Sequence, residues 1–282
     1  MQPGAGSHSV GAMAGAGRVA VVTGASTGIG AAAAARLARE PGTELVLVAR
    51  RAELLAELAE SLPCRATYVA VDLTDEDAPG RIRRHLEAEH GGRLRLLVNN
   101  AGAAWRASFG EGGHANVNRH MELNFAAVVR LTEALLPLLR ASAPSAIVNV
   151  ASTAGRVSRA RTGAYSASKF ALIGWSDSLY LEEKPHGVHV GLVLPGFIRT
   201  EGFPATELRE RALTRWIVSS PEKVARAIDE CGSGGKAERY VPRPYALAAI
   251  LRILFPSLTR RVLGGGSAAG LTTSTSAEAR GE

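Results

Sequence analysis

Tyr165 and Lys169 lie four residues apart, a spacing that places both side chains on one face of a helix. A tyrosine hydroxyl has a pKa of about 10, so it exchanges protons poorly at neutral pH unless something stabilises its phenolate. An ammonium group one helical turn away does so through its charge. The pair could therefore exchange a proton with an oxygen atom that is being reduced or oxidised. Taken alone, it also fits a tyrosine beside a lysine on an exposed helix.

A second chemical pattern is the glycine-rich stretch TGASTGIG at residues 23–30. It follows a short β-branched run and precedes an alanine-rich segment, so it predicts a turn from a strand into a helix. Glycines let the backbone approach a pyrophosphate at the helix N-terminus, although a plain connection would need no ligand. The residues expected to touch a nucleotide there are Gly24, Ser26, Thr27, Gly28, Ile29 and Gly30.

Both patterns sit in a chain where short apolar runs alternate with helical stretches. Apolar strands separated by helices predict an α/β fold with one parallel sheet covered on both faces. Right-handed crossovers then give a single doubly wound, Rossmann-type domain, whose ligands bind at the carboxyl ends of the strands. Helices are predicted over residues 29–40 and from Pro221, which follows a capping Ser220. Seven strands are predicted, over residues 19–22, 45–48, 67–71, 94–98, 147–150, 188–194 and 240–241.

Motifs after these strands resemble the short-chain dehydrogenase/reductase family over about residues 18–241, beginning with the TGxxxGIG turn. The order and spacing of several independent motifs match that family. The matching residues are Asp72 and Leu73 after the third strand, Asn99, Asn100, Ala101 and Gly102 after the fourth, Asn124 in the next helix, Ser152 after the fifth, Tyr165 with Lys169, and Pro195, Gly196 and Thr200 after the sixth.

The resemblance implies an oxidoreductase that moves a hydride between a nicotinamide and a carbonyl or alcohol. It implies that Tyr165 is the general acid in reduction and the base in oxidation, that Tyr165 and Lys169 both contact the cofactor, and that Lys169 holds the nicotinamide ribose. Ser152 would hydrogen-bond the substrate oxygen, and Asn124 would bind a water that links Lys169 to solvent. The other cofactor contacts implied are Asp72, Leu73, Asn100, Ala101, Gly102, Pro195, Gly196, the backbone of Ile198, and Thr200.

The end of the second strand bears on the choice of cofactor. An acid there would bind the ribose 2′-hydroxyl of NAD, but the position holds Ala49. Arg50 and Arg51 follow and offer planar donors to a 2′-phosphate, so NADP(H) is preferred over NAD(H). Ser26 could add a hydrogen bond, while Thr27 stands where many NADPH-using relatives have a second basic residue. The two arginines also fit a solvated helix start.

The substrate pocket is expected between residues 103–109, residues 153–164 and a substrate loop at residues 197–219. The aromatic residues in these segments fit an apolar or lipid-like carbonyl or alcohol, or simple packing contacts. Three arginines at the edge could bind a substrate carboxylate or phosphate, or form a solvated surface. The aromatic residues are Trp105, Phe109, Phe197, Phe203 and Trp216, and the arginines are Arg156, Arg159 and Arg161.

Residues 244–263 form an apolar segment with arginines and no acid, since none occurs between residues 239 and 277. The segment is too short to span a bilayer. It could lie as a helix in a membrane interface, but a helix packed over the pocket or against another subunit fits it slightly better. Peripheral membrane association of a cytoplasmic protein is therefore one expectation.

Composition limits the other classes of partner. The 282 residues carry a formal net charge of +7, but no basic reading helix or aromatic platform indicates nucleic-acid binding. Cys64 and Cys231 match no disulfide or metal spacing, so a reducing compartment and no metal site are expected. Residues 1–17 and 264–282 are expected to be disordered or flexible tails around a domain at residues 18–243.

Two other functions stay open. One is an NAD-dependent alcohol or hydroxysteroid-type dehydrogenase, because sequence does not set the direction of the reaction. The other is a non-catalytic NADPH-binding sensor on the same fold. By resemblance to the family, a homodimer or homotetramer is expected through the helices around Asn124 and Tyr165.

Overall fold

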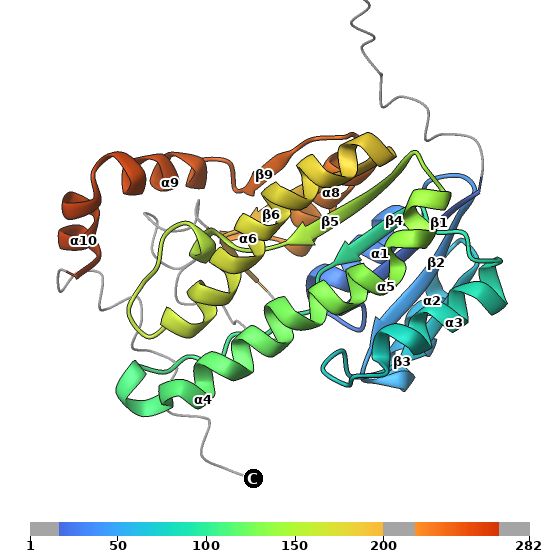
Figure 1. The fold of residues 1–282 in the computed structure, drawn as a ribbon, viewed down its shortest axis with the longest axis horizontal. Helices are drawn as coiled ribbons and strands as arrows, with labels where there is room; N and C mark the ends of the chain where they lie inside the picture. The colour runs from blue at the N-terminus through green and yellow to red at the C-terminus, as the bar shows by residue number, and fades with distance from the viewer. Residues whose placement is uncertain (1–16, 200–217, 265–282) are drawn as a thin grey trace, which may run out of the picture.

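The computed structural model describes residues 17–199 and 218–264. A seven-stranded sheet, in the order β3-β2-β1-β4-β5-β6-β9, forms the centre of the molecule, and every pair of neighbouring strands is parallel. Helices cover both faces (Figure 1), which confirms the predicted doubly wound α/β fold. The strands are β1 (Arg18–Thr23), β2 (Thr43–Ala49), β3 (Ala66–Ala70), β4 (Leu96–Asn99), β5 (Ser145–Val150), β6 (Val188–Pro195) and β9 (Glu238–Val241).

The two faces of the sheet have separate apolar cores. In β1, Ala20 and Val22 point into one core while Val19 and Val21 point into the other, and all four are buried. Burial on both faces explains why the strand reads as an unbroken apolar run. The first core packs on α1 (Gly28–Leu37), α2 (Ala52–Ser61) and α8 (Pro221–Gly232), and the second on α3 (Ala78–His90), α5 (Ala127–Ala141) and α6 (Gly163–Glu183).

The strand order reverses direction between β1 and β4, and this places the cofactor crevice. After β3 the chain crosses over β1 and continues the sheet on its other side with β4, so the carboxyl ends of β1 and β4 open between diverging connections. Such a switch point is where open α/β sheets bind ligands. The connection after β4 leads through α4 (Phe109–Met121) into η2 (Glu122–Ala126), one turn of π-helix that joins α5.

Several boundaries differ from the sequence prediction. The helix predicted over residues 29–40 ends at Leu37, and the chain turns before Pro41 and Gly42. The C-terminal segment forms two helices, α9 (Tyr245–Leu254) and α10 (Pro256–Gly264). The break falls at Phe255, because the ring of a following proline disfavours helical backbone.

Short elements near the site were absent from the prediction. β7 (Phe197–Ile198) and β8 (Val218–Ser219) pair in parallel at the two ends of the predicted substrate loop. After β5 comes a 3-10 turn, η3 (Thr153–Gly155), and α6 is followed by another, η4 (Lys184–His186). Of the residues predicted to line the site, Thr200, Phe203 and Trp216 lie outside the described residues.

Candidate active site

The turn between β1 and α1 brings its backbone against the chain after β4. Gly24 has a φ of 65°, and a Cβ on it would lie 2.9 Å from the Cα of Ala101. A Cβ on Gly30 would lie 2.1 Å from the carbonyl oxygen of Gly24, so that position accepts no side chain. The hydroxyl of Thr23 accepts hydrogen bonds from the amides of Asn100 (2.9 Å) and Ala101 (3.0 Å). The glycine turn and the NNAG motif therefore form one rigid floor.

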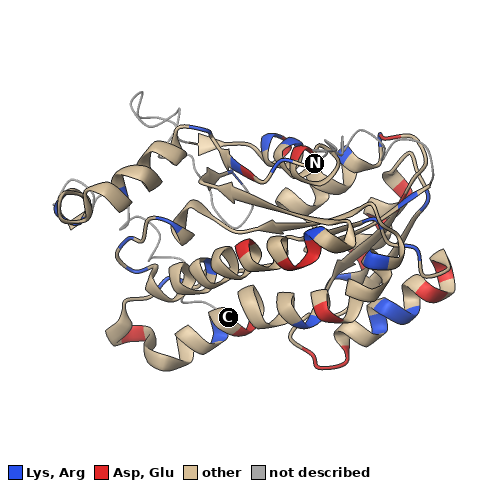
Figure 2. Cartoon of the chain, turned by 45° about the horizontal axis from the view of Figure 1, so that its top comes forward, with Lys and Arg blue, Asp and Glu red and all other residues tan. Residues whose placement is uncertain are grey.

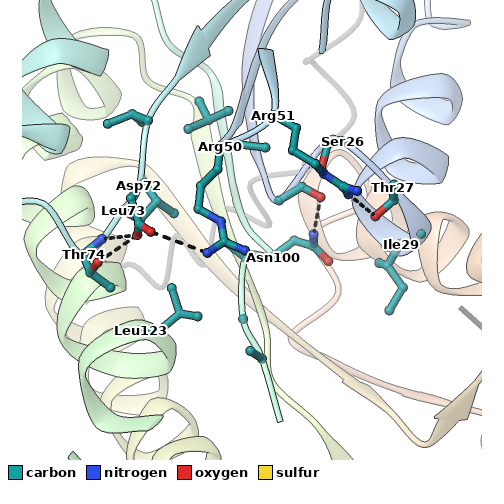
Figure 3. A pocket seen from close by; sticks show the side chains of 18 of the residues that line it. Ser26, Thr27, Ile29, Arg50, Arg51, Asp72, Leu73, Thr74, Asn100 and Leu123 are labelled. Atoms are coloured by element: carbon teal, nitrogen blue, oxygen red, sulfur yellow. Dashed lines mark hydrogen bonds and ion pairs between the residues drawn. The ribbon is translucent and has the colours of Figure 1, made fainter. Parts of the chain in front are cut away.

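A cavity of about 690 Å³ opens above this floor (Figure 3). It lies at the carboxyl ends of β1, β2 and β4, beside the N-terminus of α1. Most of the predicted cofactor contacts line it, whereas Gly30 sits behind the turn. The predicted residues at its wall are Gly24, Ser26, Thr27, Gly28, Ile29, Arg50, Arg51, Asp72, Leu73, Asn100, Ala101 and Gly102.

Arg50 and Arg51 point in different directions along this cavity (Figure 3). Arg51 donates through Nη2 to the hydroxyls of Ser26 (3.2 Å) and Thr27 (3.3 Å). Arg50 lies 3.7 Å from a carboxylate oxygen of Asp72. The backbone amide and hydroxyl of Thr74 also donate to Asp72, and together with Arg50 they hold the pKa of Asp72 below its usual value. Both guanidinium groups thus border the end of β2, where Ala49 supplies no competing acid.

A second cavity of about 720 Å³ adjoins the first and contains the Tyr–Lys pair. The two cavities share Ile29, Asn100, Gly102, Ala103 and Trp105 in their walls. The second lies over the ends of β5 and β6. The predicted residues at its wall are Ser152, Tyr165, Lys169, Pro195, Gly196 and Ile198.

Lys169 is buried beside the end of β5. Its Nζ donates to the carbonyl oxygen of Val150 at 2.9 Å and lies 6.0 Å from the centre of the Tyr165 ring. Burial lowers the pKa of Lys169 to about 8. The ammonium is therefore retained at neutral pH, but it is far easier to deprotonate than an exposed lysine.

Tyr165 differs from the simple expectation that Lys169 would lower its pKa. Burial raises the pKa of Tyr165, although interaction with the side chain of Ser152 and the charges of Arg159 and Arg106 act in the opposite direction. Burial prevails because the phenolate loses more hydration than these groups replace. The hydroxyl thus keeps its proton at neutral pH, which suits a proton donor.

Asn124 lies in the π-helical turn and is completely buried. Its Oδ1 accepts from the amide of Ala103 (2.9 Å), and its Nδ2 donates to the carbonyl of Ala103 (3.0 Å) and the hydroxyl of Ser168 (3.0 Å). A Cβ on Gly102 would lie 2.9 Å from Oδ1 of Asn124 and 3.5 Å from Nζ of Lys169. Asn124 and Lys169 therefore converge on Gly102, which keeps the space between them open.

Ser152 is the N-cap of the 3-10 turn that follows β5. Its hydroxyl accepts a hydrogen bond from the amide of Ala154 (3.1 Å) and donates one to the carbonyl of Pro195 (3.4 Å) at the end of β6. These contacts fix the side chain in the cavity that contains Tyr165. A fixed hydroxyl of this kind can hydrogen-bond a reacting oxygen without first being ordered.

His120 is a buried residue of this site that the sequence prediction missed. Its Nε2 accepts from the amide of Trp105 (3.0 Å), Nδ1 donates to the carbonyl of Asn116 (2.8 Å), and its ring meets that of Tyr165 edge-on at 6.1 Å. Burial lowers its pKa, so the ring is neutral and packs behind the tyrosine. Its position four residues before Asn124 is the signal that could have indicated it.

The described residues contain no group of three or more His, Cys, Asp or Glu side chains arranged to hold a metal ion. Across the same ranges, no helix has both the length and the apolar character needed to cross a membrane.

The depressed pKa of Lys169 makes a prediction about stability. The folded state binds this proton more weakly than the unfolded state, whose value is 10.5, so the free energy of unfolding rises with pH between about 8 and 10.5. Across that interval we expect wild type to gain about 3 kcal/mol relative to Lys169→Met in urea unfolding. Lys223→Met, at an exposed position, is the control, and wild type should not gain stability relative to it over this interval. If the stability difference between wild type and Lys169→Met did not change with pH, the prediction would be contradicted.

Known proteins resemble this chain over most of its length. The short chain dehydrogenase family matches residues 18–210. The chain is 37% identical over 219 residues to cis-4-hydroxycyclohexanecarboxylate dehydrogenase of Sinomonas cyclohexanicum, covering 75% of this chain and 87% of the relative. It is 31% identical to dehydrogenase/reductase SDR family member 7B of Bos taurus, over 87% of this chain and 80% of the relative. It is 30% identical to ketoacyl reductase HetN of Nostoc sp., over 75% and 74%. The chain belongs to the short-chain dehydrogenase family and is an oxidoreductase that acts on an alcohol or carbonyl group.

Proposed function

We propose that this short-chain dehydrogenase is an NADPH-dependent reductase of apolar or lipid-like carbonyl compounds. The observation that carries the cofactor preference is at the end of β2, where Arg50 and Arg51 border the cavity and Ala49 replaces an acid. Two guanidinium groups suit a 2′-phosphate, whereas the ribose hydroxyl of NAD would find no carboxylate there.

The residues present fit a dinucleotide. Gly24 and Gly28 leave the backbone of the turn open to the cavity at their positions, and the N-terminus of α1 favours a pyrophosphate. Asp72 and Leu73 would border the adenine, and Lys169, Ile198 and Gly196 the nicotinamide end. The nicotinamide, when bound, supplies the hydride for reduction.

Residues of the chain would supply the proton to the substrate oxygen and hydrogen-bond that oxygen. Tyr165, protonated at neutral pH, would donate its proton to the oxygen of the reduced carbonyl. Ser152 would hydrogen-bond the same oxygen from the end of β5, where its own contacts hold it in place. Lys169 and Asn124, which meet at Gly102, would return a proton to Tyr165 through water.

The substrate class draws support from the relatives and from the cavity. One relative is named for a hydroxycyclohexanecarboxylate and another for a ketoacyl group, so an alcohol or ketone on a hydrocarbon frame fits. The second cavity includes the apolar side chains of Trp105, Val157, Phe197, Ala248 and Leu263. These residues suit a hydrocarbon body beside the reacting carbonyl.

The proposal is tested by titrating NADPH and NADH separately into the purified protein and following binding by fluorescence. A panel of ketones, aldehydes and lipid-like carbonyls is then assayed with each cofactor. Tighter binding of NADPH together with turnover supports the reductase. Preference for NADH would favour the NAD-dependent dehydrogenase, whereas NADPH binding with no turnover of any carbonyl or alcohol would favour the sensor.

We also propose that α9 and α10 rest on an anionic lipid surface. Large apolar side chains are exposed along both helices, with Ile253 72% and Leu254 63% accessible. Their only charged side chains are basic, as Figure 2 shows. Exposed apolar residues interleaved with arginine match a negatively charged interface. The exposed apolar residues are Leu247, Ile250, Leu251, Ile253, Leu254, Phe255, Leu258 and Val262.

Liposome flotation tests this placement. We expect full-length protein to float with vesicles that contain phosphatidylserine, less with phosphatidylcholine alone, and not at all after Ile253→Glu with Leu254→Glu. Leu181→Glu, at a site 70% exposed on α6, is the matched control and should still float. Wild-type protein that stays at the bottom with anionic lipid present would overturn the proposal. A homodimer or homotetramer through α5 and α6 stays a prediction, measurable by light scattering.

A further inference from the structure

The loop between η3 and α6 carries three arginines, which differ in their ion-pair partners. Arg156 donates to Glu238 at 2.8 Å, and Arg161 donates to Glu111 at 3.0 Å. Within residues 17–199 and 218–264, no carboxylate lies within ion-pair distance of Arg159. Arg159 is thus the member of this group whose charge has no acid to neutralise it in the described structure.

Arg159 also lines the cavity in which the substrate would bind. Its guanidinium lies over the ring of Phe197, 4.4 Å from the ring centre, and it shares the wall of the second cavity with Ser152 and Tyr165. Tyr245 completes this side of the cavity. A guanidinium stacked on an aromatic ring still has N–H donors along its edge for a planar acceptor.

The backbone of Arg159 is held rigidly relative to the reacting centre. Its amide donates to the hydroxyl of Thr162 (3.3 Å), and that hydroxyl donates back to its carbonyl (2.9 Å). Thr162 is buried and directly precedes α6, the helix that presents Tyr165. A group bound by Arg159 would therefore be held at a fixed position relative to the proton donor.

The electrostatics of the cavity favour an anion. Burial lowers the pKa of Arg159, and the nearby charge of Arg106 acts in the same direction. Arginine nevertheless stays protonated in proteins, so this region has a positive charge with reduced hydration. Arg159 is partly buried, and a partly desolvated charge with no carboxylate beside it among the described residues is costly, so an anionic ligand would offset that cost.

We propose that Arg159 binds a carboxylate on the substrate, so that the enzyme acts on carbonyl or alcohol compounds with an apolar body and an acidic end. This inference rests on the proposed reductase site. The apolar wall would cover the hydrocarbon, and the planar guanidinium would take the carboxylate through paired hydrogen bonds. The two ends of the substrate would then fix which carbon faces Ser152 and Tyr165.

The kinetic test compares medium-chain keto acids with their methyl esters, which keep the ketone and the hydrocarbon but lose the charge. In Arg159→Met we expect kcat/KM for the keto acid to fall about 10- to 100-fold, as for loss of a charged hydrogen bond, and the ester to change far less. The ratio is the readout, because Arg159 also acts on the pKa of Tyr165 and would affect both substrates equally through it. Arg161→Met is the matched control and should preserve the ratio.

A binding test separates failure of the inference from failure of the proposed function. Linear alkanoates and the matching primary amides are titrated calorimetrically into NADPH-saturated protein, with no turnover required. We expect wild type to prefer the alkanoate, Arg159→Met to lose that preference, and Arg159→Lys to keep part of it. Equal binding of acid and amide by wild type would overturn the inference. Alkanoate binding that depends on Arg159, without turnover of any carbonyl, would contradict the reductase and leave the anion site established.

Discussion

Replacing Tyr165 with phenylalanine is expected to lower kcat for carbonyl reduction by about 10³-fold, with NADPH affinity almost unchanged. The ring remains, so its edge-on contact with His120 is kept. What is lost is the hydroxyl that gives up a proton as the substrate oxygen gains charge. Water cannot replace it well, because a neutral water is a much weaker acid than a positioned phenol. Steady-state turnover and cofactor fluorescence measure the two effects separately.

Tyr180→Phe is the matched control for this result. Tyr180 lies on the same helix, α6, and its ring contacts His189 outside the second cavity. It should retain both turnover and binding. If Tyr165→Phe kept most of its turnover, another group would be the proton donor; if it lost NADPH binding as well, the tyrosine would be structural.

Introducing an acid at the end of β2 is expected to reverse the cofactor preference. In Ala49→Asp, the new carboxylate would accept hydrogen bonds from the ribose hydroxyls of NADH and repel a 2′-phosphate. We expect the ratio of kcat/KM for NADPH to that for NADH to fall by at least about 10²-fold, since charge-assisted contacts are worth about 1.5–3 kcal/mol each. Initial rates with both cofactors, at fixed ionic strength, measure this ratio.

Truncating Arg50 and Arg51 tests whether these side chains bind the 2′-phosphate of NADPH. Arg50→Ala with Arg51→Ala should weaken NADPH selectively and leave NADH nearly unchanged. Arg39→Ala removes an exposed charge that does not line the cavity, and it should affect neither cofactor. Equal losses for NADPH and NADH in the double variant would show that these arginines serve the fold, as the contact of Arg50 with Asp72 would allow.

Local sequence predicted those parts of the fold that depend on local rules. Residues 19–22 were predicted to be a buried strand because four consecutive apolar residues suit a strand with an apolar core on each face. The structure places them in β1, an interior strand of the sheet. The glycines after this strand predicted a turn. The structure agrees, because a Cβ on Gly24 or Gly30 would lie too close to neighbouring backbone atoms. The spacing of Tyr165 and Lys169 predicted one helix face, and both side chains reach the same cavity.

The features of the fold and site that the sequence did not predict depend on contacts between residues far apart in the chain. Glu238 and Glu111 decide which arginines are neutralised, and nothing near residues 156–161 indicates those partners. The pKa of Tyr165 is raised by burial among surrounding elements, and the spacing to Lys169 carries no information on that burial. The pairing of β7 with β8 likewise joins short segments from the two ends of a long connection, with no periodic pattern to reveal it.

The order of the strands also governs how the molecule is assembled during synthesis. β1, β2 and β3 are complete by Ala70, but Leu96, Leu97 and Val98 of β4 must emerge before the other edge of β1 is paired. Until then, a nascent chain exposes an apolar strand edge, which is a site for aggregation. Because the cofactor cavity needs both β1 and β4, a bound nucleotide cannot stabilise that early unit. Its binding energy acts only after the two halves of the sheet have joined, so it stabilises the folded enzyme and not the early unit.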